Sequence, residues 1–498
     1  MAAFHELSCV KVAEKCVGLV LRGLYGVIAA PKVLSMLRIF APLVALLALP
    51  ATAQPLASAK IAEIDQLVTR TLADTGVPSA EIAIVRDGEL VLTKAYGKAN
   101  ERLNANPNLP YQIASNSKQF TAMALLLLRD DGKLSLDDPV SKYVPGITEG
   151  DRITIRQLIS HTSGLQDFWP QDYMFSDMTV PTTPQHIVDK WAKKPLDFQP
   201  GARWQYSNTG YVVAGMIAEK VSGQPLLSFL NERIFGRLGM HPLDQDNTNT
   251  PAFPAGYHRF ALGPVHVARP PARGWLYAAG ELSMTAADLA KWDIARINRG
   301  LIPARDWAEQ ETPVVRTDGR TNGYGLGVYN HSARERHIID HGGEAVGFLT
   351  QNTVYPDTKD AIIVFTNADF SGATDTLTSG IEKIVLDSPE AALSGEGDRL
   401  ADVKAVYDAL ASGQVDRSQF TPNLNYYFDP TTLSDYRSSL ARLGAPAAIT
   451  INRSPRLRGG FVNRNYTVSY AGGKKLSLVT YAEAGARGRW EQFMIMPE

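Results

Sequence analysis

The chain has 498 residues, of which 45% are hydrophobic, and a formal net charge of −1, values typical of a globular protein with two or three domains. A charge near zero argues against nucleic acid as the main partner, because phosphate binding needs a basic surface. Both cysteines, Cys9 and Cys16, lie near the N-terminus, so the rest of the chain offers no disulfide, thiol nucleophile or cysteine-ligated metal. We expect no metal and no cofactor.

Residues 36–53 have the pattern of a secretory signal peptide. A basic residue is followed by an apolar run of about eleven residues and an Ala51-x-Ala53 cleavage site. The run is shorter than the ~20 residues of a membrane-spanning helix. We therefore expect cleavage after Ala53, a periplasmic or secreted product, and no stable membrane span after processing. Residues 1–35 are interpreted as an upstream extension of uncertain translation, and a single anchor built from residues 17–50 is the alternative.

The next part of the chain alternates between β-like and helical patterns. Helical apolar spacing covers residues 60–75, and two β-like runs at 80–85 and 90–95 are joined by Asp87-Gly88, a strong hairpin signal. Further β-like runs cover residues 337–340, 348–355 and 361–366, and the region between is mostly helical, including 119–128 and 211–221. A sheet built from both ends of one domain, with helices inserted, predicts an α+β fold with an antiparallel sheet.

A change in composition at residues 386–398 predicts a linker between a main domain, residues 57–390, and an accessory α+β domain, residues 396–498. The accessory domain begins with an amphipathic helix near 400–410. Its predicted β runs cover residues 448–452, 461–470, 474–481 and 490–496. One helix and a curved sheet resemble nuclear-transport-factor-like domains, and we expect Tyr426-Tyr427-Phe428 in its core. Covering the active site, dimerisation and polymer binding all remain open as its role.

Ser115 and Lys118 form a Ser-x-x-Lys motif where a helix is predicted to begin. Positions i and i+3 share a helix face, so the amine lies over the hydroxyl. The helix N-terminus offers unpaired N–H groups for a developing oxyanion. A lysine base must lose about three pKa units, through burial or a nearby positive charge. The motif alone is weak, because Ser8 and Lys11 form another copy.

Two more short motifs follow in the same domain. Tyr206-Ser-Asn208 offers a phenol that can relay a proton and an amide that can bind a carbonyl. His341-Gly342-Gly343 is interpreted as a strand that ends in glycines, which let backbone N–H groups approach a ligand. Each alone has a plain structural explanation as a helix cap or a turn. Their order and spacing fit the triple of motifs of penicillin-recognising enzymes.

These motifs make residues 57–390 similar to the serine β-lactamase-related hydrolases, which include class C β-lactamases, D-alanyl-D-alanine carboxypeptidases, D-aminopeptidases and family VIII esterases. Supporting segments are Leu158-Ile-Ser-His161-Thr-Ser-Gly-Leu165, 132–139, 279–285 and 323–327. The resemblance implies a sheet flanked by helices, a mostly helical second lobe and a site between them.

The resemblance also implies a role for each motif residue. Ser115 would form an acyl-enzyme, Lys118 and Tyr206 would move its proton, and Asn208 would orient the substrate. His341 stands where β-lactamases have lysine, and the N–H groups of Ser115 and Glu344 would form the oxyanion hole, beside Gly342 and Gly343. Ser160-His161 is interpreted as a structural turn beside the site.

His341 decides between substrate classes. A histidine is mostly neutral above pH 7 and holds a carboxylate less well than lysine does. It also stabilises a tyrosinate less, which favours Lys118 as the base. We therefore expect an exported hydrolase of D-amino-acid peptides or esters, acting on a small molecule or short peptide, with cell-wall peptides among the candidates. A β-lactamase, a slow-turnover penicillin-binding sensor and an acyltransferase remain as alternatives.

Overall fold

The computed structural model describes residues 55–333, 336–386, 399–458, 461–483, 485 and 487–497. The predicted signal peptide, the extension with both cysteines and Ser8–Lys11, and most of the predicted linker lie outside these residues. Within the described ranges, no helix has both the length and the apolar character needed to cross a membrane.

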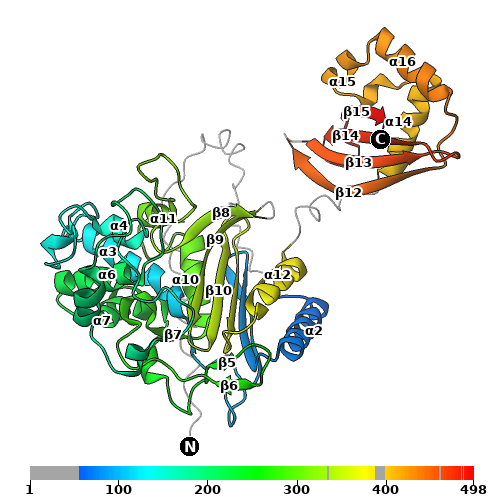
Figure 1. Ribbon diagram of the computed structural model, residues 1–498. Coiled ribbons are helices and arrows are strands. Elements are labelled where there is room, and N and C mark those ends of the chain that lie inside the picture. The colour runs from blue at the N-terminus through cyan, green and yellow to red at the C-terminus, as the bar shows by residue number, and fades with distance from the viewer. Residues whose placement is uncertain are drawn as a thin grey trace, which may run out of the picture. The chain divides into compact units, whose positions relative to one another are not determined.

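A six-stranded antiparallel sheet lies at the centre of the larger part of the chain (Figure 1). In spatial order its strands are β2 (Glu89–Gly97), β1 (Ser79–Arg86), β11 (Asp360–Thr366), β10 (Phe348–Tyr355), β9 (Arg336–Ala345) and β8 (Tyr329–Ala333). The pairing of β1 with β11 brings the two ends of this region together in the middle of the sheet. The α+β prediction is confirmed. So is the hairpin at Asp87-Gly88, where both residues have the positive φ of a tight hairpin turn.

Strand β1 is buried on both faces, and most of its buried side chains are apolar. Ile82 and Ile84 share a core with helices α2 (Ser58–Thr75) and α12 (Ala373–Val385). Ala83 and Val85, which point the other way, belong to the core that includes α10 (Ala286–Ile297). The sheet therefore separates two helical layers, which Figure 1 shows on its two sides.

A mostly helical lobe lies between β2 and β8 in the sequence. Its helices are α3 (Lys118–Asp130), α4 (Ile155–Ile159), α5 (Pro184–Ile187), α6 (Asn208–Ser222), α7 (Leu226–Leu230), α8 (Gly236–Leu238), α9 (Tyr277–Gly280) and α11 (Ala304–Glu311). Short strands in the lobe are β3 (Tyr111–Gln112), β4 (Leu243–Asp244), β5 (Tyr257–Arg259), β6 (Val265–Val267) and β7 (Leu282–Met284). Every residue of α3 from Lys118 to Leu128 is buried. This helix is therefore held by packing on all sides, which fixes the position of its N-terminus.

The C-terminal part has a hydrophobic core of its own. Helix α14 (Leu400–Ser412) packs with a four-stranded antiparallel sheet, β12 (Ala448–Arg458), β13 (Phe461–Ser469), β14 (Lys475–Glu483) and β15 (Trp490–Pro497). Two helices were not predicted, α15 (Pro422–Tyr427) and α16 (Pro430–Ala441). Both begin with proline after a capping residue, Thr421 or Asp429. The expectation for the aromatic run is wrong in part: Phe428 is buried, but Tyr426 is 89% exposed and Tyr427 42%.

Candidate active site

Ser115 lies in a short 3₁₀ helix, η1 (Ala114–Ser117), which joins strand β3 to helix α3. From residue 111 to residue 128, every residue except Ser115 is buried. The preceding Ala114 has a φ of 48°, in the left-handed region that residues other than glycine seldom adopt and that recurs at functional sites. The chain thus turns within a rigid, buried segment and presents one hydroxyl outward.

Lys118 is fully buried behind Ser115 and is held by three polar contacts. Its Nζ lies 3.0 Å from Ser115 Oγ, 2.8 Å from Asn208 Oδ1 and 2.7 Å from the carbonyl oxygen of Ala279. The two carbonyl-type oxygens can only accept a hydrogen bond. A neutral amine therefore donates its two N–H bonds to them and keeps its lone pair for the Ser115 hydroxyl. The predicted i, i+3 contact between amine and hydroxyl is present.

Burial also sets the protonation state of this amine. It lowers the pKa of Lys118 from its ordinary value to about 7, while the negative charge of Asp167 acts in the opposite direction. A lysine that acts as a base must lose about three units from its ordinary pKa of about 10.4, and desolvation of the buried Lys118 amine accounts for that loss. Near pH 7 a large fraction of the molecules holds the amine in its neutral, basic form.

Asp167, which was not among the predicted site residues, orients Asn208. Its Oδ1 accepts from the backbone N–H of Asn208 at 3.0 Å, and its Oδ2 accepts from Asn208 Nδ2 at 3.2 Å. Because a carboxylate only accepts, the second bond fixes the amide with Oδ1 toward Lys118. Asp167 occupies an ordinary loop sequence, 41 residues before its partner. No local signal marks it.

His161 packs against the ring of Tyr206 and binds the backbone on either side of it. The rings lie 4.1 Å apart, centre to centre. The backbone N–H groups on either side of Tyr206 bind His161: Gln205 donates to its carbonyl oxygen at 2.9 Å and Ser207 donates to Nδ1 at 3.1 Å. Burial lowers the pKa of His161 well below its usual range. It is a neutral structural support beside the site, as predicted.

Tyr206 lies beside the nucleophile, and Lys118 Nζ lies 4.8 Å from the centre of its ring. Burial raises the pKa of Tyr206 well above its ordinary range, with the Ser115 contact acting in the opposite direction. The phenol therefore keeps its proton at neutral pH. Ser207 caps helix α6 by accepting from the N–H of Gly210, which places Tyr206 and Asn208 at the start of that helix.

His341 is buried and neutral. Burial, and then the nearby Lys118, lower its pKa to about 4. Nδ1 lies 2.5 Å from the carbonyl oxygen of Gly342, which can only accept, so Nδ1 carries the proton and Nε2 accepts from Tyr324 at 3.0 Å. The His341 side chain is therefore uncharged not only at neutral pH, as expected from the sequence, but also well below it.

The interpretation of Gly342-Gly343 as the end of a strand is wrong. β9 continues through both glycines to Ala345, and only then turns into β10. A Cβ on Gly343 would lie 2.1 Å from the carbonyl oxygen of Ile113. Glycine is required there because β9 lies directly against the segment that carries Ser115, and the strand edge, not a turn, faces the nucleophile.

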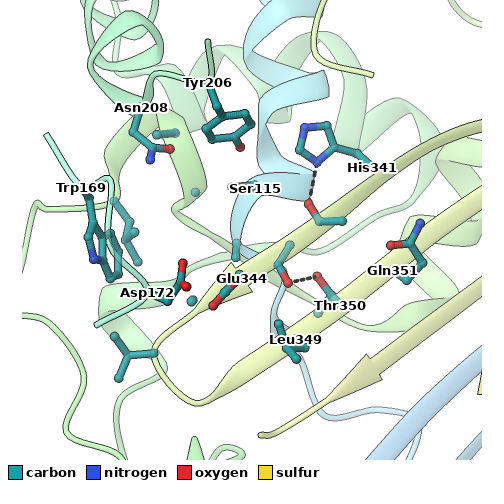
Figure 2. Close-up of a pocket in the computed structure, with 18 of the residues that line it drawn as sticks. Ser115, Trp169, Asp172, Tyr206, Asn208, His341, Glu344, Leu349, Thr350 and Gln351 are labelled. Carbon is teal, nitrogen blue, oxygen red and sulfur yellow. Dashed lines mark hydrogen bonds between the residues drawn. The ribbon is translucent and has the colours of Figure 1, made fainter. Parts of the chain in front are cut away.

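These residues surround one cavity of about 660 Å³ (Figure 2). The predicted site residues that line it are Ser115, Tyr206, Asn208, His341, Gly342, Gly343 and Glu344. Lys118 lies behind Ser115, in contact with it. The structure thus brings all the predicted site residues together, although they come from segments more than 200 residues apart. It adds Asp167 and His161 to them.

A first prediction follows from the Lys118 pKa. With an uncharged ester, kcat/KM is expected to rise with pH around a midpoint near 7, because only the neutral amine can take the Ser115 proton. Asp167→Asn removes a charge that raises this pKa, so the midpoint should fall by about half a unit to one unit. Exposed Asp151, which does not line the cavity, provides the control Asp151→Asn. A midpoint that rises or stays in place in Asp167→Asn would contradict this assignment.

Comparison with known proteins identifies the family of the chain. The Beta-lactamase family model matches residues 64–383. Protein PbpX of Bacillus subtilis, named as a penicillin-binding protein, is 28% identical over 311 residues, which are 62% of this chain and 75% of that protein. The solved structure of a D-stereospecific amidohydrolase from Streptomyces sp. has a TM-score of 0.57 at 29% identity, covering 65% of this chain and 98% of its own. That of the D-amino acid amidase from Ochrobactrum anthropi SV3 has a TM-score of 0.57 at 25% identity, covering 66% and 96%. The chain therefore belongs to the β-lactamase family, and it is a serine hydrolase with the fold of that family.

Proposed function

We propose that this chain is an exported hydrolase of amides or esters that works through an acyl-enzyme on Ser115. One observation supports this proposal above all. The buried Lys118 amine, with a pKa near 7, lies 3.0 Å from the Ser115 hydroxyl, and Ser115 lines the cavity. Two of the similar structures are named as an amidohydrolase and an amidase, which favours amide substrates.

The proposed reaction begins at the Ser115 hydroxyl. Its oxygen attacks the substrate carbonyl carbon while Lys118 Nζ takes the proton. Collapse of the tetrahedral intermediate breaks the bond to the leaving amine or alcohol, which receives a proton by way of the Tyr206 phenol. Water then attacks the acyl-enzyme with Lys118 again as base, which releases the acid and restores Ser115. Asn208 holds Lys118 in place and faces the same cavity.

The N–H groups of Ser115 and Glu344 form the oxyanion hole in this proposal. Ala345 and Phe348 close a two-residue turn, and Glu344 and Leu349 are the next facing pair of the β9–β10 ladder. Hydrogen-bonded and non-hydrogen-bonded pairs alternate in such a ladder. The Glu344 N–H is therefore expected to point away from β10, toward the edge of β9 that contacts η1. One such donor is typically worth about 10²–10³ in rate.

A second prediction concerns β-lactams. Among the residues the structure describes, those that line the cavity include no lysine or arginine, and His341 is neutral. A substrate carboxylate such as that of nitrocefin would lack a cationic partner, which should lower kcat/KM at least about tenfold. We expect kcat/KM for nitrocefin to be at least about tenfold below that for p-nitrophenyl butyrate or a D-amino-acid amide. Comparable values would contradict the assignment to amides and esters.

Intact-mass analysis tests the proposed mechanism and export together. A fluorophosphonate should add one label, mapped to the peptide that contains Ser115, and protein from the exported fraction should begin at Gln54. A label on another residue would overturn the nucleophile, and a mass that retains residues 36–53 would overturn cleavage. A fluorescent penicillin label that persists for hours would instead favour a slow-turnover sensor.

A further inference from the structure

The hydroxyl of Thr350, on β10, joins the sheet to the segment that carries Ser115. Thr350 is 3% exposed and lines the cavity (Figure 2). Its Oγ1 lies 3.0 Å from the carbonyl oxygen of Ile113 and 3.0 Å from Asn116 Nδ2. A carbonyl oxygen can only accept, so the hydroxyl donates to Ile113 and accepts from Asn116. One oxygen atom of the sheet therefore binds the chain on both sides of Ser115.

The same hydroxyl also lies against Gly343 of β9. Thr350 and Gly343 face each other across the β9–β10 ladder, and Thr350 Oγ1 lies 3.4 Å from the Gly343 carbonyl oxygen. A Cβ on Gly343 would lie 2.3 Å from Thr350 Oγ1. Glycine at this position therefore leaves the space through which the hydroxyl reaches across β9 to η1. Glu344 is the next residue of β9, so this contact lies beside both N–H groups of the proposed oxyanion hole.

The bond from Asn116 has no substitute within the described part of the chain. Asn116 is fully buried, its Nδ2 binds only Thr350 there, and its Oδ1 has no hydrogen-bond partner. Removal of the Thr350 hydroxyl would leave this buried amide unpaired, which is costly, so we expect η1 to shift. A displacement of about 1 Å at a catalytic group can lower a rate about 10²-fold.

We propose that Thr350 is a positioning residue whose hydroxyl sets the distance between the N–H groups of Ser115 and Glu344. The inference rests on the proposed function, because it assumes that an oxyanion forms between these two groups. Lys118 is held by other contacts, none of them to Thr350. The base and the oxyanion hole are thus positioned by separate hydrogen bonds, and loss of one need not disturb the other.

The test uses a substrate and an inhibitor with the same acyl group, p-nitrophenyl butyrate and 1,1,1-trifluoropentan-2-one. The Ser115 oxygen adds to the ketone carbon, its proton passes to Lys118, and the ketone oxygen becomes an oxyanion. Thr350→Val keeps the shape of the side chain without the hydroxyl. We expect it to lower kcat/KM about 10²-fold and to raise the Ki of the ketone by a similar factor. A smaller population of folded enzyme would lower the rate without changing Ki.

Three further measurements accompany this variant. The midpoint of the pH profile should stay near 7, because Lys118 keeps its contacts. Thr350→Ser restores the hydroxyl and should stay within about threefold of wild type, whereas Asn116→Ala, which removes the other partner, should change both constants about tenfold. The matched control is Thr480→Val, at a buried strand threonine that donates to a carbonyl oxygen at 3.2 Å and does not line the cavity. It should leave both constants unchanged.

The outcomes separate this inference from the proposed function. An unchanged Ki in Thr350→Val, a shift of the pH midpoint that accounts for the lost rate, or an equal loss in Thr350→Ser would overturn the positioning role. If Thr350→Val does not fold, Asn116→Ala decides by the same two constants, and an unchanged Ki there would also overturn it. Hydrolysis of p-nitrophenyl butyrate that does not depend on Ser115 would instead overturn the proposed function.

Discussion

Replacement of Ser115 by alanine is expected to reduce kcat/KM for p-nitrophenyl butyrate by at least about 10⁴-fold, the scale seen when a serine nucleophile is removed. The hydroxyl is the group that would form the covalent bond, and every other residue from 111 to 128 is buried. No nearby side chain in that segment is placed to replace it. Initial rates across a substrate series, together with loss of fluorophosphonate labelling, check this.

Ser160→Ala is the matched control. Ser160 is a buried serine next to His161, so it is a second serine with a histidine beside it near the site. Its hydroxyl is 2.9 Å from that of Thr162, and His161 is occupied with the segment that holds Tyr206. We expect a change within about threefold. Retained activity in Ser115→Ala with loss in Ser160→Ala would reverse the assignment.

Lys118→Met is expected to slow acylation by about 10³-fold, within the range that a general base contributes. Methionine keeps much of the length and the apolar stem, so the buried site stays filled, but its thioether sulfur is far too weak a base to take the Ser115 proton. The remaining candidate, the Tyr206 phenol, has its pKa raised well above 10 and holds its own proton. Pre-steady-state acylation measured by stopped flow gives the rate of this step.

Tyr206→Phe distinguishes the two candidate bases. If Lys118 is the base, Tyr206 only passes a proton to the leaving group. A p-nitrophenyl leaving group needs no proton, so Tyr206→Phe should lower the acylation rate of a p-nitrophenyl ester only about tenfold. Acylation at the normal rate in Lys118→Met, or a larger loss in Tyr206→Phe than in Lys118→Met, would show that the phenol is the base.

Local patterns predicted the site motifs and every strand of the six-stranded sheet except β8. The hairpin at Asp87-Gly88 and the run at 348–355 carry period-two or continuous apolar signals, and β10 has those bounds. Ser115 and Lys118 could be linked because a helical spacing of three residues fixes their contact. The order of the motifs then placed Tyr206, Asn208 and His341 in the same site.

What the sequence did not reveal depends on contacts between distant segments. Asp167 acts through Asn208, and its loop has no pattern that points to that partner. The course of β9 through Gly343 depends on the approach of Ile113, about 230 residues earlier, so two glycines suggested a turn instead. Helix α15 has six residues, too few to show a helical period, whereas α16 does carry Leu433, Tyr436 and Leu440 at helical spacing, a signal that could have predicted it.

Burial of Lys118 also links the catalytic amine to the stability of the fold. On unfolding, this amine returns to water, where its pKa is about 10.4, whereas in the folded chain the pKa is about 7. Between these two values the unfolded chain binds a proton that the folded chain does not, so unfolding takes up a proton and stability rises with pH by up to about 4–5 kcal/mol. Buried Glu281, with a pKa raised to about 8, acts in the opposite direction between its ordinary value and 8. Near pH 7 and below, burial of Lys118 therefore lowers the free energy of unfolding by close to its full amount. In alkaline solution this destabilisation disappears, and the same amine is in its neutral, basic form.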